Sequence, residues 1–329
     1  MRQGTHDGIE AHVISSVTAP GISLPASILV GPGDDMAAIA PQACIHGVLA
    51  ACDQVVEGRH FTRQTPLALV GRKVVARNIS DVAAMGAEPL ATLASCVLPR
   101  RIGIDGAQTL LESLRRHAAQ WGAPLIGGDT AVHADSDGPL TLSVTILARP
   151  RVSADGQPRR IVLRRGARAG DALYVTGALG GSFGADGLGR HLHFEPRLAA
   201  AHALADALGD ALHAMIDVSD GLGLDAGRIA GASEGQLTAL IDGARVPRHA
   251  GVSLEAAISD GEDHELLLAV AADASVPELL PDGQGGSVRC TRIGSCVPRA
   301  PSMPDARSAL VNPATGAVQD ISRKGWMHE

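Results

Sequence analysis

Carboxylates beside glycines are the residues of this sequence best placed to do chemistry. In "VGPGDDMAAI", the neighbouring Asp34 and Asp35 follow a Gly-Pro-Gly turn and precede an apolar run. Adjacent carboxylates repel each other unless a cation offsets their charge. Further acidic residues stand where apolar runs end or turns begin: Asp53, Asp81, Asp129, Asp217, Asp220, Glu262 and Asp263. Such hard oxygen ligands suit Mg²⁺, which binds through a few carboxylates together with substrate phosphates.

Each acidic motif also has a plainer interpretation, because an aspartate beside a glycine is usually a turn residue or a helix N-cap. Asp220, for example, could cap a helix that begins near Gly221. The magnesium hypothesis therefore depends on six acidic motifs taken together. The sequence contains no calcium loop, Walker phosphate loop, kinase catalytic loop or zinc-protease motif. The run "TGALGGSFGADGLG" does not match G-x-G-x-x-G and is weak support for phosphate binding.

Strands and helices that alternate along the chain must position these carboxylates. In the first half we predict strands in "HGVLAACDQVV", "ATLASCVLP" and "LTLSVTILA", and helices over 105–120, with Asp105 as N-cap, and over "PLALVGRKVVARNISDVAAMG". A basic, turn-rich stretch at 149–170 precedes a second half with the strands "ALYVTGALGG", "ELLLAVAA" and "VRCTRIG" and the helix "PRLAAAHALADAL". The pattern predicts an α/β or α+β protein with two domains, 1–150 and 151–329.

Composition narrows the possible function classes. The 329 residues carry a formal net charge of -7, which argues against a broad nucleic-acid-binding surface. No apolar run is long enough to span a bilayer, and the N-terminus lacks a signal-peptide core, so we expect a cytoplasmic protein. Aromatic residues make up only 2%, which predicts an aliphatic core. The five cysteines include no C-x-x-C pair and are expected to be reduced and mostly buried.

In this order, the motifs resemble those of the thiamine-monophosphate kinase family, within the superfamily of aminoimidazole ribonucleotide synthetase and selenophosphate synthetase. The matching segments, which extend from residue 31 to residue 328, are "GPGDDMAAI", "DQVVEGRHF", "NISDVAAMGAEP", "IGGDT", "RRGARAGDALYVTG", "IDVSDGL", "GEDHELL" and "KGWMH". The Asp-Gly motifs occur across the superfamily. "EGRHF", "GEDHEL" and the terminal aromatic residue are typical of the thiamine-phosphate branch.

The resemblance implies an aminoimidazole ribonucleotide synthetase-like fold. Its N-terminal mixed-sheet domain would bind ATP and several Mg²⁺ ions and would pair with a second copy to form a homodimer. The C-terminal α/β domain would cover the active site. The implied reaction is in-line transfer of the ATP γ-phosphoryl group to thiamine monophosphate, which gives thiamine diphosphate and ADP. The acceptor phosphate is largely dianionic at neutral pH, so no general base is needed and no catalytic side chain is assigned.

The resemblance also assigns three groups of site residues by position. The implied Mg²⁺ ligands are Asp34, Asp35, Asp53, Asp81, Asp129, Asp217 and Asp220. The implied ATP contacts are Gly128, Asp129, Arg164 and Ser219. The implied thiamine-phosphate pocket contains His60, Glu262 and Trp326. Trp326 could offer its aromatic face to the cationic thiazolium, or it could be a hydrophobic plug that closes the C-terminus.

Four positions depart from the family pattern. Ala51 and Cys52 precede Asp53 where the family usually has Ser or Thr, Asp260 replaces a glycine, and His264 stands where a tyrosine is common. Ala51 has no hydroxyl oxygen to offer a cation, and a cysteine sulfur is a poor Mg²⁺ ligand. Two alternatives stay open. One is an ATP-dependent enzyme of the same superfamily that acts on an amide or carbamoyl oxygen, and the other is a non-catalytic homologue that binds nucleotide or thiamine phosphate.

Overall fold

The computed structural model describes residues 24–31 and 36–326, which divide into two compact units. The N-terminal unit comprises residues 1–79 and 88–159, and the C-terminal unit comprises residues 80–87 and 160–329. Helix α2 (Leu67–Ala84) contributes to both units, because the division falls after Ile79. Asp34 and Asp35 lie outside the described residues.

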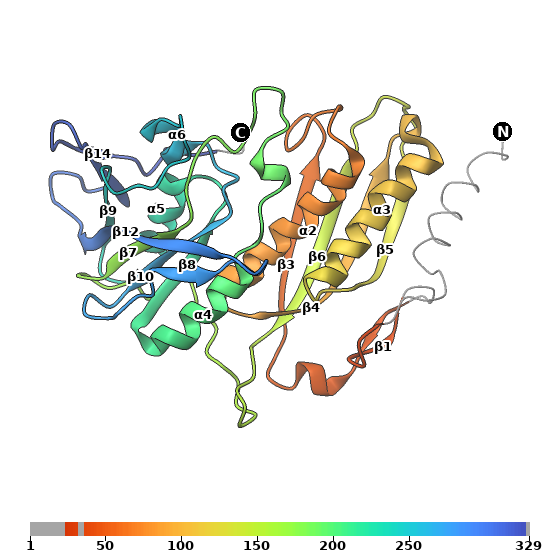
Figure 1. Cartoon of the computed structure of the whole chain (residues 1–329), viewed down its shortest axis with the longest axis horizontal. Helices are drawn as coiled ribbons and strands as arrows, with labels where there is room; N and C mark the ends of the chain where they lie inside the picture. Colours follow the sequence, from red (N-terminus) through yellow and green to blue (C-terminus); the bar gives the residue numbers. More distant parts are fainter. Residues whose placement is uncertain (1–23, 32–35, 327–329) are drawn as a thin grey trace. The chain divides into compact units, whose positions relative to one another are not determined.

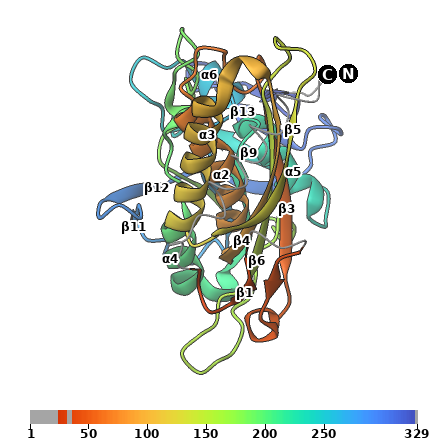
Figure 2. The ribbon, with the colours of Figure 1, turned by 90° about the vertical axis from the view of Figure 1, so that its right-hand side faces the viewer.

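The N-terminal unit is built on a mixed four-stranded sheet with the strand order β3-β6-β4-β5. The strands are β3 (Leu49–Val56), β4 (Glu88–Leu98), β5 (Leu125–Val132) and β6 (Thr141–Arg149). β4 and β5 are parallel, whereas β6 is antiparallel to both of its neighbours. Helices α2 and α3 (Gly103–Gln120) cover one face of this sheet (Figures 1 and 2). A short hairpin, β1 (Ile28–Val30) with β2 (Ala38–Ile39), packs against Ala91 and Ile126.

Local sequence signals explain where the two helices of this unit lie. Pro66, which we expected in the first turn of α2, directly precedes the helix, and Gly86, with φ 61°, lies just past its end, as the sequence predicts. The prediction of Asp105 as the N-cap of α3 is wrong. The N-cap is Ile102, and Asp105 lies in the first turn, where its charge still suits the positive end of the helix dipole.

The C-terminal unit is built on an eight-stranded sheet with the order β14-β13-β9-β12-β7-β10-β8, in which β11 also pairs with β12. Only the β13–β9 pair of this described sheet is parallel. Its strands are β7 (Ala172–Thr176), β8 (Leu212–Val218), β9 (Leu237–Asp242), β10 (Glu265–Val270), β11 (Leu279–Pro281), β12 (Ser287–Pro298), β13 (Ser308–Val311) and β14 (Val318–Asp320). The helices are α4 (Leu198–Leu208), α5 (Leu222–Ala232) and α6 (Leu254–Ser259). Short 3₁₀ turns occupy Pro41–Cys44 and Arg100–Ile102 in the N-terminal unit and Arg190–Leu192 and Gly209–Ala211 in the C-terminal unit.

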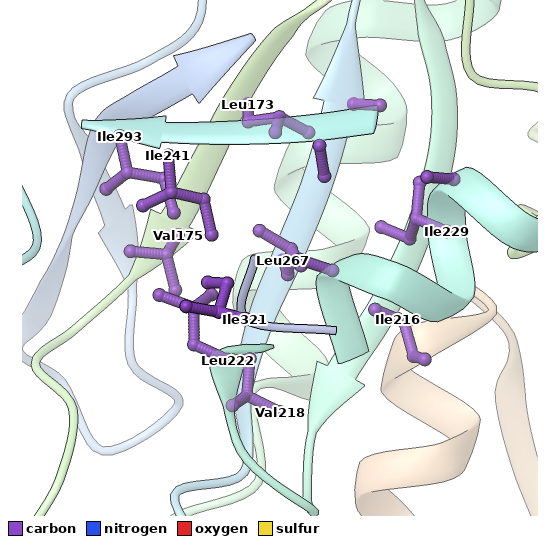
Figure 3. Packing of buried hydrophobic residues seen from close by; sticks show 14 of the residues in the cluster. Leu173, Val175, Ile216, Val218, Leu222, Ile229, Ile241, Leu267, Ile293 and Ile321 are labelled. Atoms are coloured by element: carbon purple, nitrogen blue, oxygen red, sulfur yellow. The ribbon is translucent and has the colours of Figure 1, made fainter. Parts of the chain in front are cut away.

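Helices cover both faces of this larger sheet, so strand β10, which lies between β7 and β8, is buried along its whole length. All six residues of β10 are buried. Leu267 packs in one cluster with residues of α5, and Leu266 packs in a second cluster with residues of α4. Figure 3 shows the first cluster, in which Leu267 and Ile229 point into a common aliphatic core. The packing explains why Glu265 is followed by the continuous apolar run "LLLAV", and it fixes the strand end from which the candidate site is built.

The α/β fold class expected from the sequence is confirmed. Among the described residues, no helix is both long and apolar enough to cross a membrane. The cytoplasmic location stays a prediction.

Candidate functional site

The end of β8 brings two of the predicted motifs together within the C-terminal unit. Asp217 is buried at this strand end, and its Oδ2 accepts a hydrogen bond of 2.7 Å from the hydroxyl of Ser80. Ser80 precedes the half-buried Asp81 in α2, so "NISDV" and "IDVSDG" meet although they are far apart in the sequence. The same Oδ2 lies 3.3 Å from Nδ1 of His264. Asp217 is therefore held from two sides.

The turn that follows β8 is held by a buried aspartate from the next helix. The carboxylate of Asp225, in the first turn of α5, accepts hydrogen bonds from the backbone N–H groups of Ser219 (3.1 Å) and Asp220 (3.0 Å). Arg228 pairs with both Asp225 (2.5 Å) and Asp220 (2.6 Å). The N-cap of α5 is Gly221, and it makes no side-chain cap, so Asp220 does not act as the simple N-cap that the sequence allowed.

The segment after α6 lies against this turn in a rare backbone conformation. Glu262 and His264 have φ values of 56° and 52°, in the left-handed region that favours glycine. Two backbone hydrogen bonds hold them there, from Glu262 N–H to the carbonyl of Ser219 (2.7 Å) and from His264 N–H to the carbonyl of Val218 (2.8 Å). Non-glycine residues persist in this conformation only where the surroundings impose it, which often happens at functional sites.

His264 lies buried between two carboxylates. Its Nδ1 is 3.3 Å from Asp217, and its Nε2 is 3.3 Å from Oε2 of Glu262. Its ring stacks on Phe194, with ring centroids 4.2 Å apart. Burial lowers the pKa of His264, but hydrogen bonds and charge from Asp217 and Glu262 outweigh this effect and raise the pKa to about 9. The ring is therefore an imidazolium at neutral pH.

The C-terminal aromatic residue is fastened to the same turn. The backbone N–H of Trp326 donates to the carbonyl of Asp220 at 2.7 Å. Its indole ring stacks near Phe183, with a centroid distance of 6.3 Å and an interplanar angle of 21°. Trp326 remains 37% exposed, whereas a plug would be buried. The unit thus brings together five predicted site residues: Asp217, Ser219, Asp220, Glu262 and Trp326.

The glycine-rich run at 176–189 is bonded through its backbone to two carboxylates. The N–H of Gly180 donates to both carboxylate oxygens of Asp263, at 3.0 and 2.9 Å, and the N–H of Gly181 donates to Asp260 at 2.8 Å. Burial raises the pKa of Asp263 to about 6, although the hydrogen bonds from Ser182 and Gly180 act in the opposite direction. Asp260, one of the departures from the family pattern, therefore anchors this loop.

In the N-terminal unit, Asp53 and Asp129 lie on the two edge strands of the sheet, β3 and β5. Three strand spacings separate edges of this kind by about 14 Å. The strand register aligns Asp129 with Gln54 across the sheet, so these two side chains point to the same face. Asp53 is the neighbour of Gln54 in β3, so its carboxylate points to the opposite face from that of Asp129. Asp53 lies 3.3 Å from Arg77 of α2, whereas Asp129 is exposed. The unit by itself does not bring these two carboxylates together.

Three more predicted residues have clear local surroundings. A Cβ atom at Gly128 would lie 2.0 Å from the carbonyl oxygen of Ala94, so pairing with β4 already requires a glycine there. Nδ1 of His60 accepts the N–H of Val56 at 3.1 Å and holds the turn after β3. Arg164 is exposed, in the segment before β7.

Sequence reasoning missed the residues that support the site: Ser80, Asp225 and Arg228. The i, i+3 spacing of Asp225 and Arg228, directly after "SDGLGL", was the available signal for the ion pair. No group of three or more His, Cys, Asp or Glu side chains in the described part of the chain is arranged to hold a metal ion.

Comparisons with known proteins identify the class first. Residues 33–149 match the family model "AIR synthase related protein, N-terminal domain". The fold matches E. coli HypE, a hydrogenase maturation protein, with a TM-score of 0.70 at 18% identity, over 95% of each chain, and this likeness shows the fold alone. The chain thus has the fold of the AIR synthase-related proteins.

The particular family follows from sequence relatives. The chain is 37% identical over 316 residues to the thiamine-monophosphate kinase of Rhodopirellula baltica. This alignment covers 92% of each of the two proteins. The crystal structure of thiamine-monophosphate kinase from Stenotrophomonas maltophilia K279a matches with a TM-score of 0.66 and 27% identity, over 87% of this chain and 92% of that one. The chain belongs to the thiamine-monophosphate kinase family.

Proposed function

We propose that the protein transfers the γ-phosphoryl group of ATP to thiamine monophosphate, giving thiamine diphosphate and ADP. One observation carries this proposal beyond family membership. The C-terminal unit gathers Asp217, Asp220, Glu262 and Trp326 from three separate segments, and backbone hydrogen bonds join these segments to one another. An arrangement of carboxylates beside an exposed indole suits a ligand that is cationic at one end and phosphorylated at the other.

The proposed thiamine end lies at Trp326 and Glu262. A thiazolium cation over an indole face gains about 0.5–2 kcal/mol, depending on how far the contact is desolvated. The Glu262 carboxylate can accept a hydrogen bond from an aminopyrimidine or offset the positive ring. His60, the third predicted pocket residue, stays a proposal.

The proposed phosphate end depends on Mg²⁺, and the oxygens of Asp217, Asp220 and Glu262 are of the chemical type that this ion prefers. These three carboxylates stand against the cations Arg228 and His264, and a fourth, Asp225, whose pKa burial raises to about 7, adds part of a negative charge. This excess of negative charge suits a divalent cation, and Mg²⁺ commonly binds through only one or two carboxylates plus water and phosphate oxygens. When bound, Mg²⁺ would offset the repulsion between the two polyanionic substrates. The remaining proposed ligands are Asp34, Asp35, Asp53, Asp81 and Asp129, and the proposed ATP contacts are Gly128, Asp129, Arg164 and Ser219.

The chain's own residues then act by position rather than by proton transfer. A phosphate acceptor is already largely dianionic at neutral pH, so a general base is not required. Asp225 and Arg228 would keep the Ser219–Asp220 turn in place, and Ser80 would orient Asp217. Pre-organisation of this kind avoids rearrangement at the moment of transfer.

We also propose that the protein is a homodimer that pairs the sheets of two N-terminal units. The sheet face opposite α2 and α3 carries the exposed side chains of Cys52, Leu93 and Val97. Apolar residues on an open sheet face favour association with another surface. Sedimentation equilibrium should give twice the 33.6 kDa of one chain, and Leu93→Asp should shift the mass toward that of the monomer.

Product analysis distinguishes this function from the alternatives. Incubation with ATP, Mg²⁺ and thiamine monophosphate should give thiamine diphosphate and ADP in equal amounts by chromatography. ADP without thiamine diphosphate would point to another acceptor, such as an amide or carbamoyl oxygen. Binding of thiamine monophosphate without either product would identify a non-catalytic homologue.

A further inference from the structure

His264 contacts both Asp217 and Glu262, two side chains that have different roles in the proposed function. One ring nitrogen lies 3.3 Å from Asp217, a proposed metal ligand, and the other lies 3.3 Å from Glu262, in the proposed thiamine pocket. The side chain of His264 is 1% exposed. Contacts through both ring nitrogens leave the imidazole little freedom to reorient.

The surroundings of the ring restrict it further. Phe194 stacks on it with an interplanar angle of 17°, and the backbone N–H of His264 is bonded to Val218 of β8. Both Glu262 and His264 have positive φ values, and their side chains meet at 3.3 Å. Residues held in this backbone conformation cluster at functional sites, which supports a role for the contact beyond packing.

We propose that His264 is a positioning residue that sets the place of the Glu262 carboxylate in the thiamine-phosphate pocket by anchoring it to Asp217. The inference rests on the proposed function. A shorter or single-ended side chain cannot contact both carboxylates from one position, because they approach opposite nitrogens of the ring. The effect on substrate should therefore pass through Glu262.

A double-mutant cycle on binding separates positioning from simple stabilisation. The dissociation constant for thiamine monophosphate is measured by isothermal titration calorimetry, at one fixed Mg²⁺ concentration, for the unaltered protein, His264→Gln, Glu262→Ala and the double variant. We expect each single change to weaken binding about tenfold, the size expected for residues in direct contact. The double variant should bind no more weakly than Glu262→Ala alone.

A matched control and a second variant keep the test decisive. His213→Gln removes another histidine–carboxylate pair of the same unit, formed by the half-buried His213 with Asp171 at 2.9 Å, and should lower the Tm without changing the dissociation constant. If His264→Gln does not fold, Phe194→Leu removes the stacking surface and keeps the histidine. That change should weaken binding about threefold, and it should have no effect when Glu262 is already alanine.

The outcomes distinguish this inference from the function on which it rests. Unchanged binding by folded His264→Gln, or losses that multiply in the double variant, would overturn the positioning role while the kinase proposal stands. Absence of binding by the unaltered protein would overturn the proposed function, and this inference with it.

Discussion

Replacement of Asp225 removes the group that holds the Ser219–Asp220 turn. Its side chain is fully buried, accepts two backbone N–H groups at 3.1 and 3.0 Å, and pairs with Arg228. A hydrogen bond to a charged group contributes about 1.5–3 kcal/mol, but burial of the carboxylate costs part of that gain. Arg228 is 39% exposed and keeps its pairing with Asp220, so loss of Asp225 mainly leaves two backbone N–H groups without an acceptor, at about 1–3 kcal/mol each.

We therefore expect Asp225→Ala to lower the free energy of unfolding by about 2–6 kcal/mol. Asp225→Asn should cost less, about 1–3 kcal/mol, because its amide oxygen can still accept hydrogen bonds. Urea unfolding followed by circular dichroism, in buffer with a chelator, measures both values without a contribution from bound metal. The slope of the transition should stay unchanged, which would show that the same surface is exposed on unfolding.

Asp282 provides the matched control. Its carboxylate also accepts two backbone N–H groups, those of Gln284 (2.8 Å) and Gly286 (2.9 Å), but it lies at the surface, where water can replace them. Asp282→Ala should cost less than about 1 kcal/mol, as is usual for a surface substitution. A loss at Asp225→Ala no larger than the loss at Asp282→Ala would refute the reasoning that burial makes this carboxylate important.

Three further predictions concern the pocket, the thiols and the pH dependence. Trp326→Ala should raise the KM for thiamine monophosphate about tenfold and leave the KM for ATP unchanged. Trp326→Phe should retain part of the affinity for thiamine monophosphate. Equal effects on the KM values of both substrates would contradict a contact between Trp326 and thiamine. All five cysteines are free, and burial raises the pKa of the Cys96, Cys290 and Cys296 thiols to about 12, so iodoacetamide should leave these three unlabelled in the native protein and label Cys44. Cys52 lies on the proposed dimer face, so mass spectrometry should find it labelled in the Leu93→Asp variant and protected in the native dimer. The pKa of His264, about 9, lies above its ordinary value, so the stabilising contribution of its charge is complete below about pH 6.5 and is lost as the pH rises through 9. The metal-free protein should therefore lose stability over this pH range, and the His264→Gln variant should show a shallower loss.

The fold could be predicted largely because its elements are locally encoded. Of the β-rich runs predicted in the first half, one contains β3 and the other two overlap most of β4 and β6, and Pro66 and Gly86 flank α2. The Asp105 prediction failed because nothing in the sequence showed that α3 begins at Gly103, before the first polar capping residue. Helix ends depend on such local competition and are less well encoded than the apolar face.

The site was predictable in its residue types but not in its contacts. The hydrogen bond from Ser80 to Asp217 joins residues 137 positions apart, and no local pattern encodes such a pair. Positive φ values at Glu262 and His264 run against the preferences of both residues, so propensity could not reveal them. The separation of Asp53 from Asp129 follows from the strand order β3-β6-β4-β5, which is a property of the whole sheet. Sequence identified candidate ligands, and only the strand order and backbone turns determine which of them can meet.

The most direct test of the central claim measures thiamine diphosphate formation by two aspartate variants. Asp217→Asn keeps the size of a buried site residue but removes its charge, whereas Asp155→Asn makes the same change in an exposed turn. With ATP, Mg²⁺ and thiamine monophosphate, we expect the unaltered protein and Asp155→Asn to form product at equal rates. Asp217→Asn should lose at least about a hundredfold in kcat, comparable to removal of one electrostatic contact to a transition state. Equal rates for all three proteins would contradict the account.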